Sequence, residues 1–139
     1  MSRRGAGRRV APEQWRALLV VVEAAVALQP ETATVIGRCL YSGRSRGSEL
    51  AQQVTRLTSG YAYLISRVDE LRPSLVTDEV GRLLRYHHML LAETARYAYN
   101  SANPLPNERW RYVGDLGHPA ARLRDLRELV AGMAEQAAQ

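Results

Sequence analysis

Residues 48–72 read SELAQQVTRLTSGYAYLISRVDELR, and their apolar side chains recur at alternating intervals of four and three residues. Residues spaced in this way share one face of an α-helix, and the pattern continues for three heptads without a break. It predicts a long amphipathic helix whose buried face consists of Leu50, Val54, Leu57, Tyr61, Leu64, Val68 and Leu71.

A second stretch with the same spacing follows Arg72-Pro73, where the first helix is expected to end because a residue before proline disfavours the α conformation. Thr77 is a plausible N-cap for the next helix, with acidic residues in its first turn. Helices over 48–72 and 77–100 would form a long antiparallel hairpin. The buried face of the second one is predicted to contain Val76, Val80, Leu83, His87, Leu90, Thr94 and Tyr97.

Three further helices are expected around this hairpin. Pro12 suits a first helical turn and begins a helix to about Leu28, Pro30 begins another that ends near Gly43, and His118-Pro119 begins the last. The run Leu18–Val22 is apolar nearly all round, which predicts that the first helix is either the central helix or a dimer contact. The sequence therefore predicts an all-α bundle of four to five helices.

Length and composition fit a single domain. The chain has 139 residues, 46% of them hydrophobic, so we expect one helical domain over 12–139 and a disordered basic tail over 1–11. Cys39 is the only cysteine, and no internal disulfide can form, as is usual in the cytoplasm. The longest apolar run, Ala17–Val22, is shorter than the roughly 20 residues of a membrane span, so no membrane association is expected.

The positive charge is unevenly distributed. All nineteen basic residues are arginines, and the four in the tail carry most of the net charge of +5. A second group lies in the expected loop 103–115, where basic and aromatic residues alternate, a pairing that grips phosphates and stacks bases. A nucleic-acid site would therefore consist of Arg3, Arg4, Arg8, Arg9, Arg109, Trp110, Arg111 and Tyr112. The alternative is a solubilising leader and a loop strapped over the bundle by its aromatic rings.

The two adjacent histidines do not form a metal site. Neighbouring helical residues point about 100° apart, so His87 and His88 cannot chelate one ion, and the residues one turn from His87 are leucines. We expect His87 to lie in the seam, hydrogen-bonded across the bundle, and His88 to lie on the surface. Glu23 and Glu93 fall near apolar faces, where a buried pair is conceivable. No catalytic set, metal or cofactor is predicted.

The separation of Arg82 from His87 is similar to the Arg-x4-His spacing of the all-helical HEPN ribonucleases. The resemblance covers two residues and would imply a small ribonuclease. Within one continuous helix, however, residues five apart are turned about 140° from each other, which places the two side chains on different faces.

Three classes of function follow from these patterns. The first is a non-enzymatic regulatory or accessory bundle in the cytoplasm that acts by protein contact and forms a homodimer, with another protein as a possible partner. The second is a nucleic-acid-binding protein that uses the tail and the 103–115 loop. The third is a small helical ribonuclease or ligand-binding bundle.

Overall fold

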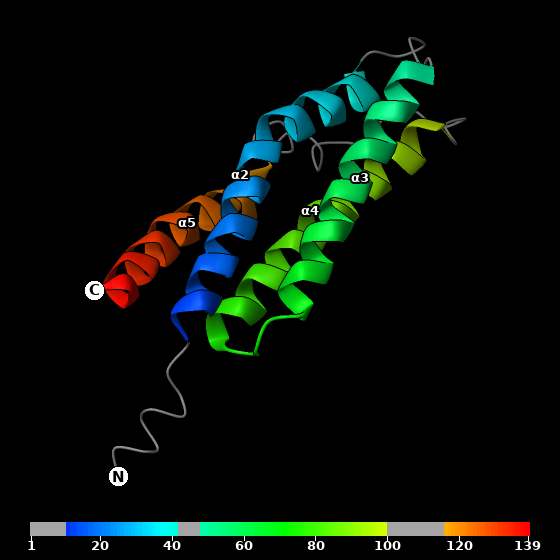
Figure 1. The fold of residues 1–139 in the computed structure, drawn as a ribbon. Coiled ribbons are helices and arrows are strands. Elements are labelled where there is room, and N and C mark those ends of the chain that lie inside the picture. Colours follow the sequence, from blue (N-terminus) through cyan, green and yellow to red (C-terminus); the bar gives the residue numbers. More distant parts are fainter. Residues whose placement is uncertain (1–10, 42–47, 100–115) are drawn as a thin grey trace.

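The computed structural model describes residues 11–41, 48–99 and 116–139, which form an all-α fold. Its helices are α2 (Pro12–Tyr41), α3 (Ser48–Asp69), α4 (Leu75–Tyr99) and α5 (Gly117–Ala138), shown in Figure 1. All but the last residue of the expected tail 1–11 and the whole of the expected loop 103–115 lie outside the described residues.

The first of these helices corrects the sequence prediction. Two helices separated at Pro30 were expected, but α2 is one helix of 30 residues with Pro30 inside it. Proline cannot donate to the carbonyl of Val26 and its ring crowds that carbonyl, so an interior proline costs about 3 kcal/mol. Figure 1 shows α2 changing direction near this point. Burial of Gln29, Thr32 and Val35 on both sides of the proline offsets that cost.

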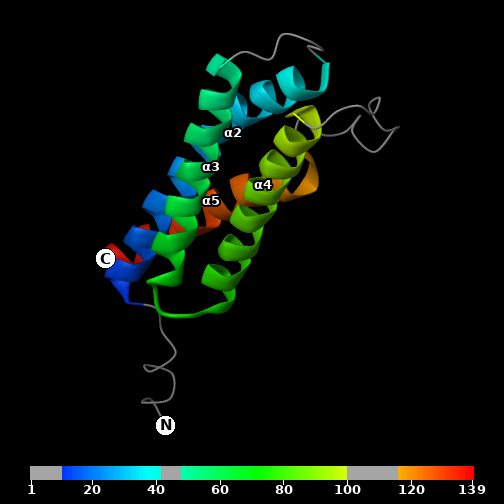
Figure 2. The ribbon, with the colours of Figure 1, turned by 90° about the vertical axis from the view of Figure 1, so that its right-hand side faces the viewer.

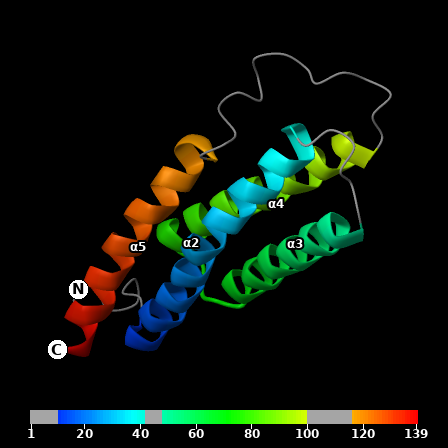
Figure 3. The same cartoon turned by 90° about the horizontal axis from the view of Figure 1, so that it is seen from above.

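The same helix lies at the centre of the described fold. It contacts each of the other three helices, and its largest interface is with α5. Figure 3 shows α5 and α3 on opposite sides of α2. Helices α3 and α4 pack along each other, and Figure 2 shows them running in opposite directions from their short connection. Because α5 contacts α2 and α4 but not α3, it lies against a three-helix unit.

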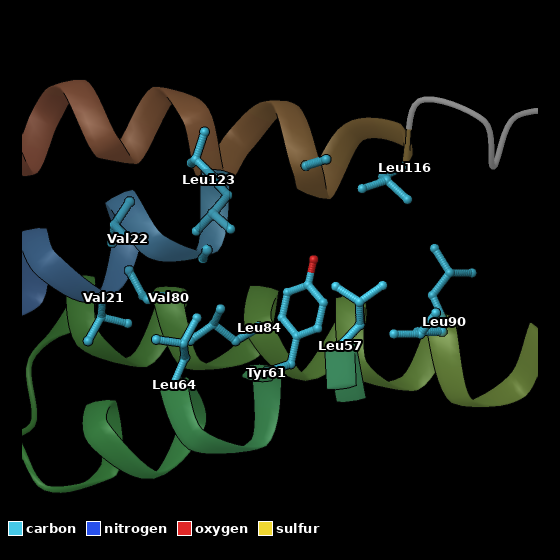
Figure 4. Packing of buried hydrophobic residues seen from close by; sticks show 14 of the residues in the cluster. Val21, Val22, Leu57, Tyr61, Leu64, Val80, Leu84, Leu90, Leu116 and Leu123 are labelled. Atoms are coloured by element: carbon cyan, nitrogen blue, oxygen red, sulfur yellow. The ribbon is translucent and has the colours of Figure 1, made fainter. Parts of the chain in front are cut away.

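The heptad pattern of α3 places its apolar residues in the core. Six of the seven predicted seam residues are buried, and Leu71, beyond the end of the helix, is half-buried. Figure 4 shows Tyr61, Leu57 and Leu64 directed from α3 into the space between the helices. In α4, the buried face includes Val80, Leu84, His87, Leu90, Leu91 and Thr94.

Helix α4 begins two residues earlier than predicted, because its N-cap is Ser74 and not Thr77. The Ser74 hydroxyl accepts a hydrogen bond from the Thr77 amide at 3.1 Å, and the Thr77 hydroxyl accepts one from the Ser74 amide at 2.7 Å. This reciprocal pair satisfies two amide groups at the helix start, as in a capping box.

Among the described residues, α2 is the one helix that is long and apolar enough to cross a membrane, by length and composition only. The helix reaches this length and hydropathy because it continues through Pro30. The run Ala17–Val22 alone is too short to cross a membrane. The core helix of a bundle passes the same test, and α2 buries Trp15, Leu18 and Val22 against its neighbours.

Candidate functional site

The residues predicted to bind nucleic acid lie outside the described residues, namely Arg3, Arg4, Arg8, Arg9, Arg109, Trp110, Arg111 and Tyr112. The described residues carry eleven arginines and twelve acidic side chains. Six of those arginines form ion pairs. The excess positive charge of the chain therefore belongs to residues 1–10 and 42–47, and the described surface has no net basic character.

Two further hypotheses from the sequence are not supported by the geometry. Glu23 and Glu93 are both exposed, and Glu93 pairs with Arg96 at 2.6 Å, so no buried acidic pair forms. Arg82 is exposed whereas His87 is fully buried, and the two do not share a site. No group of three or more His, Cys, Asp or Glu side chains in the described part of the chain could hold a metal ion.

The structure instead brings together one set of polar side chains from all four described helices. We call it the central polar cluster, and it consists of Gln29 and Thr32 from α2, Tyr61 from α3, His87 from α4 and Arg124 from α5. The first four of these side chains are almost entirely buried. Buried polar groups are costly unless they are hydrogen-bonded, so the bonds within the cluster decide whether it is stable.

The side-chain amide of Gln29 connects α2 to α5. Its Oε1 accepts a hydrogen bond from Arg124 Nη1 at 2.9 Å, and its Nε2 donates to the carbonyl of Ala120 at 3.2 Å. The same Nε2 lies 3.5 Å from His87 Nε2. Gln29 is only 5% exposed, and each of its polar atoms meets a group of the correct type.

The bonds around His87 fix it as a neutral ring. Its Nδ1 lies 2.7 Å from the carbonyl of Leu83, which can only accept, so Nδ1 carries the proton and Nε2 faces the Gln29 amide as an acceptor. The ring stacks on Tyr61 with centroids 5.7 Å apart and meets the edge of Tyr86 at 5.8 Å. Burial lowers the pKa of His87 below its ordinary value, the Arg124 charge lowers it further, and the Leu83 bond opposes both.

The hydroxyl of Tyr61 completes the cluster. It lies 2.7 Å from the hydroxyl of Thr32, which in turn donates to the carbonyl of Leu28 at 2.7 Å. Burial raises the pKa of Tyr61, and the hydrogen bond to Thr32 opposes that rise in part. Figure 4 shows the hydroxyl oxygen of Tyr61 directed away from α3. The phenol therefore stays protonated and links α3 to α2.

A groove reaches the cluster from the surface beside the bend of α2. It has a volume of about 310 Å³, and we call it the α2–α5 groove; it is lined by Val26, Gln29, Pro30, Ala33, Leu116 and Arg124. Leu116 is the N-cap residue of α5, lies in the left-handed conformation with φ of 63°, and makes no capping hydrogen bond with its own side chain. The groove is therefore apolar on most of its surface and has one cation and one amide.

A second cavity, of about 320 Å³, lies at the α3–α4 connection. It is lined by charges of both signs, among them Asp69, Asp78, Arg82 and Arg85. Arg85 is bound to Asp69 at 2.9 Å. With two acids against two arginines, this cavity has no net charge with which to select an ion.

The heptad spacing predicts His87 as a seam residue with a hydrogen bond across the bundle, but it does not predict Gln29 as its partner. A helix boundary at Pro30 places Gln29 in a connection between two helices. Once α2 is continuous, Gln29 falls four residues after Ala25 and three after Val26, on the buried face of the helix. The spacing of three and four residues from Val26 and Ala25 is thus the sequence signal that predicts the burial of Gln29.

The central polar cluster links side chains from all four described helices. Its histidine is fully buried and its two hydroxyls are bonded to each other, so it offers no open nucleophile or base. A search of family models, of curated proteins and of solved structures found no match to this chain, so the function must be inferred from the geometry.

Proposed function

We propose that the chain is a cytoplasmic, non-enzymatic helical bundle, built on the α3–α4 hairpin with α2 through its centre, which acts by protein contact. In this proposal it is a regulatory or accessory protein whose first contact is a second copy of itself. The surface formed jointly by α2 and α3 is the contact. We call it the α2–α3 face and define it by Val20, Ala27 and Tyr63.

The observation that carries the proposal is the exposure of large apolar side chains on this face. Val20 is 69% exposed and Tyr63 is 62% exposed, although the helices bury other apolar side chains efficiently. Ala27 lies on the same exposed stripe of α2, seven residues after Val20. A small residue on this exposed stripe lets a second helix approach closely.

The ion pair between Glu31 and Arg56 supports the placement of the two apolar side chains on one side of the fold, because it joins α2 to α3 at the surface. Glu31 follows Val20 by eleven residues, which is about three helical turns, so both point to nearly the same side of α2. Arg56 precedes Tyr63 by seven residues, or about two turns, and shares its side of α3. The ion pair between Arg56 and Glu31 therefore joins α2 to α3 along the surface on which Val20 and Tyr63 are exposed.

Charged side chains surround these apolar ones. Arg16 and Glu23 flank Val20 on the exposed side of α2, and Arg67 lies one turn beyond Tyr63 and pairs with Glu70 at 2.8 Å. An apolar centre with a polar rim is the usual composition of a protein interface. Charges of both signs on the rim suit a face that meets its own copy in the opposite orientation.

Light scattering during size-exclusion chromatography tests the proposal. The wild-type chain is expected to elute at about twice its monomer mass of 15.5 kDa, and Val20→Glu should shift it to the monomer mass because the buried charge is unpaired in the interface. Leu129→Glu is the matched control, since Leu129 is an exposed leucine of α5, which does not contact α3. A wild-type monomer at high concentration, or equal loss in both variants, would contradict the α2–α3 face.

One observation favours the nucleic-acid alternative. The described residues carry one more acidic than basic side chain, while the whole chain has a net charge of +5. Any attraction to phosphates would therefore come from the arginines outside the described residues, above all from the four between positions 3 and 9. Truncation of the tail separates this alternative from the proposal.

A further inference from the structure

We infer that the α2–α5 groove is a binding site for a small monocarboxylate with a short apolar chain. This goes beyond the proposed self-association, which uses a different face of α2. The inference rests on the shape of the groove, on the charge of Arg124, which forms no ion pair within the described part of the chain, and on the bond from Arg124 to the buried Gln29.

The size and the lining of the groove limit the ligand. A volume of about 310 Å³ is at the lower end of the range for small-molecule sites. Four of its lining residues, Val26, Pro30, Ala33 and Leu116, present apolar surface. The polar groups gather at one side, where Arg124 and Gln29 meet. A ligand with an apolar chain and one charged end matches this division.

Arg124 supplies the charge that recognises that end. Six arginines of the described residues are neutralised by carboxylates, but the partner of Arg124 is the neutral amide oxygen of Gln29. The guanidinium makes that bond with Nη1, and a guanidinium has five N–H donors. The remaining donors can grip a carboxylate through two parallel bonds, which is the geometry that arginine favours.

The bond to Gln29 holds the guanidinium in place before a ligand arrives. Gln29 is 5% exposed and is fixed in turn by the carbonyl of Ala120 at 3.2 Å and by the His87 ring. A pre-positioned side chain loses less freedom on binding, which favours affinity. Because Gln29 contacts both Arg124 and His87, a bound carboxylate would also change the surroundings of the buried ring.

Sodium isovalerate and its neutral analogue isovaleramide are suitable probes, because they differ in charge and share the same apolar chain. Titrations followed by two-dimensional NMR should show saturable shifts of the Gln29 side-chain amide with isovalerate. Isovaleramide should bind at least about tenfold more weakly, since it lacks the charge-assisted bonds. Equal binding of the two compounds, or no saturable shift with isovalerate, would overturn the inference.

Three variants locate the site. Arg124→Gln should weaken isovalerate binding at least about tenfold, whereas Arg127→Gln, on the same helix and paired with Glu128, should not. Ala33→Leu fills the groove without touching the charge and should also abolish binding, which keeps the test valid if Arg124→Gln disturbs the fold. Equal losses in Arg124→Gln and Arg127→Gln would show general charge attraction and overturn the site. Val20→Glu should bind isovalerate normally, so failure of the dimer and failure of the groove can be told apart.

Discussion

His87 is held as a neutral ring by partners from three helices. The carbonyl of Leu83 accepts a hydrogen bond from Nδ1, which carries the proton. The side-chain amide of Gln29 faces Nε2, and the ring of Tyr61 stacks on one side of the imidazole. None of these partners is a carboxylate, and the nearest charge that affects it is the positive one of Arg124. A proton added to this ring would be buried beside a cation, and none of its partners in the described part of the chain is an anion that could compensate it.

Protonation of His87 should therefore lower the stability of the fold in mild acid. In the unfolded chain the group titrates near its ordinary pKa of 6.5, whereas burial lowers its pKa in the folded protein. The free energy of unfolding should be undiminished above about pH 6.5. It should fall by up to about 1.4 kcal/mol per pH unit as the pH drops from about 6.5 to the lowered pKa of the folded protein. Urea unfolding at several pH values between about 7.5 and 5 measures this slope.

His87→Gln keeps a polar side chain at the position and removes the titration, so its stability should vary little with pH in this range. His88→Gln, at the half-buried neighbouring position, should retain the wild-type slope. A slope that survives in His87→Gln would assign the acid sensitivity to another group.

At the scale of single helices, the seam of α3 is expected to dominate stability. Leu57 is 1% exposed and Leu64 is 6% exposed, and both belong to the buried core formed by the helices. Leu57→Ala and Leu64→Ala should each lower the free energy of unfolding by about 2–5 kcal/mol through lost burial and the cavity that remains. Thermal or urea unfolding checks this, with Gln52→Ala on the exposed side of α3 as the control. Losses below about 0.5 kcal/mol at both leucines would refute the register.

The helices differ in how well their sequences predict them, for physical reasons. The α3 seam is an uninterrupted heptad pattern, so its buried residues follow from local spacing alone. The continuity of α2 does not, because a proline inside a helix is unfavourable locally and is tolerated only through tertiary contacts of residues such as Gln29 and Thr32. Likewise, Ser74 and Thr77 are both good caps, and only the observed reciprocal bonds choose between them. The α2–α5 groove depends on the bend in α2 and on the position of α5 beside it. No local sequence pattern predicts either of these.

At the scale of the whole molecule, the separation of charge provides a test of nucleic-acid binding. If the protein binds duplex DNA, the tail arginines must supply the attraction, because the described surface is nearly neutral. Each phosphate neutralised contributes about −0.9 to the slope of log K against log salt. Deletion of residues 1–9 should then remove up to roughly 3–4 units of slope and most of the binding. Titration of labelled duplex and single strands at two salt concentrations measures both quantities.

Replacement of Arg3, Arg4, Arg8 and Arg9 by Gln is the matched control, since it removes the charge and keeps the length of the tail. The two variants should lose binding together. Equal, weak binding by the intact and truncated proteins would leave the tail as a leader and remove the nucleic-acid alternative.

The position of α2 also has a consequence for synthesis on the ribosome. Its largest interface is with α5, and 75 residues separate the end of one helix from the start of the other. At about 5–20 residues added per second, the ribosome needs roughly 4 to 15 seconds to span that distance. Throughout this interval the strip of α2 that α5 will cover, on which Val26 lies, is open to other nascent chains and to chaperones. The helix that organises the finished fold is thus the one that waits longest for its partner during translation.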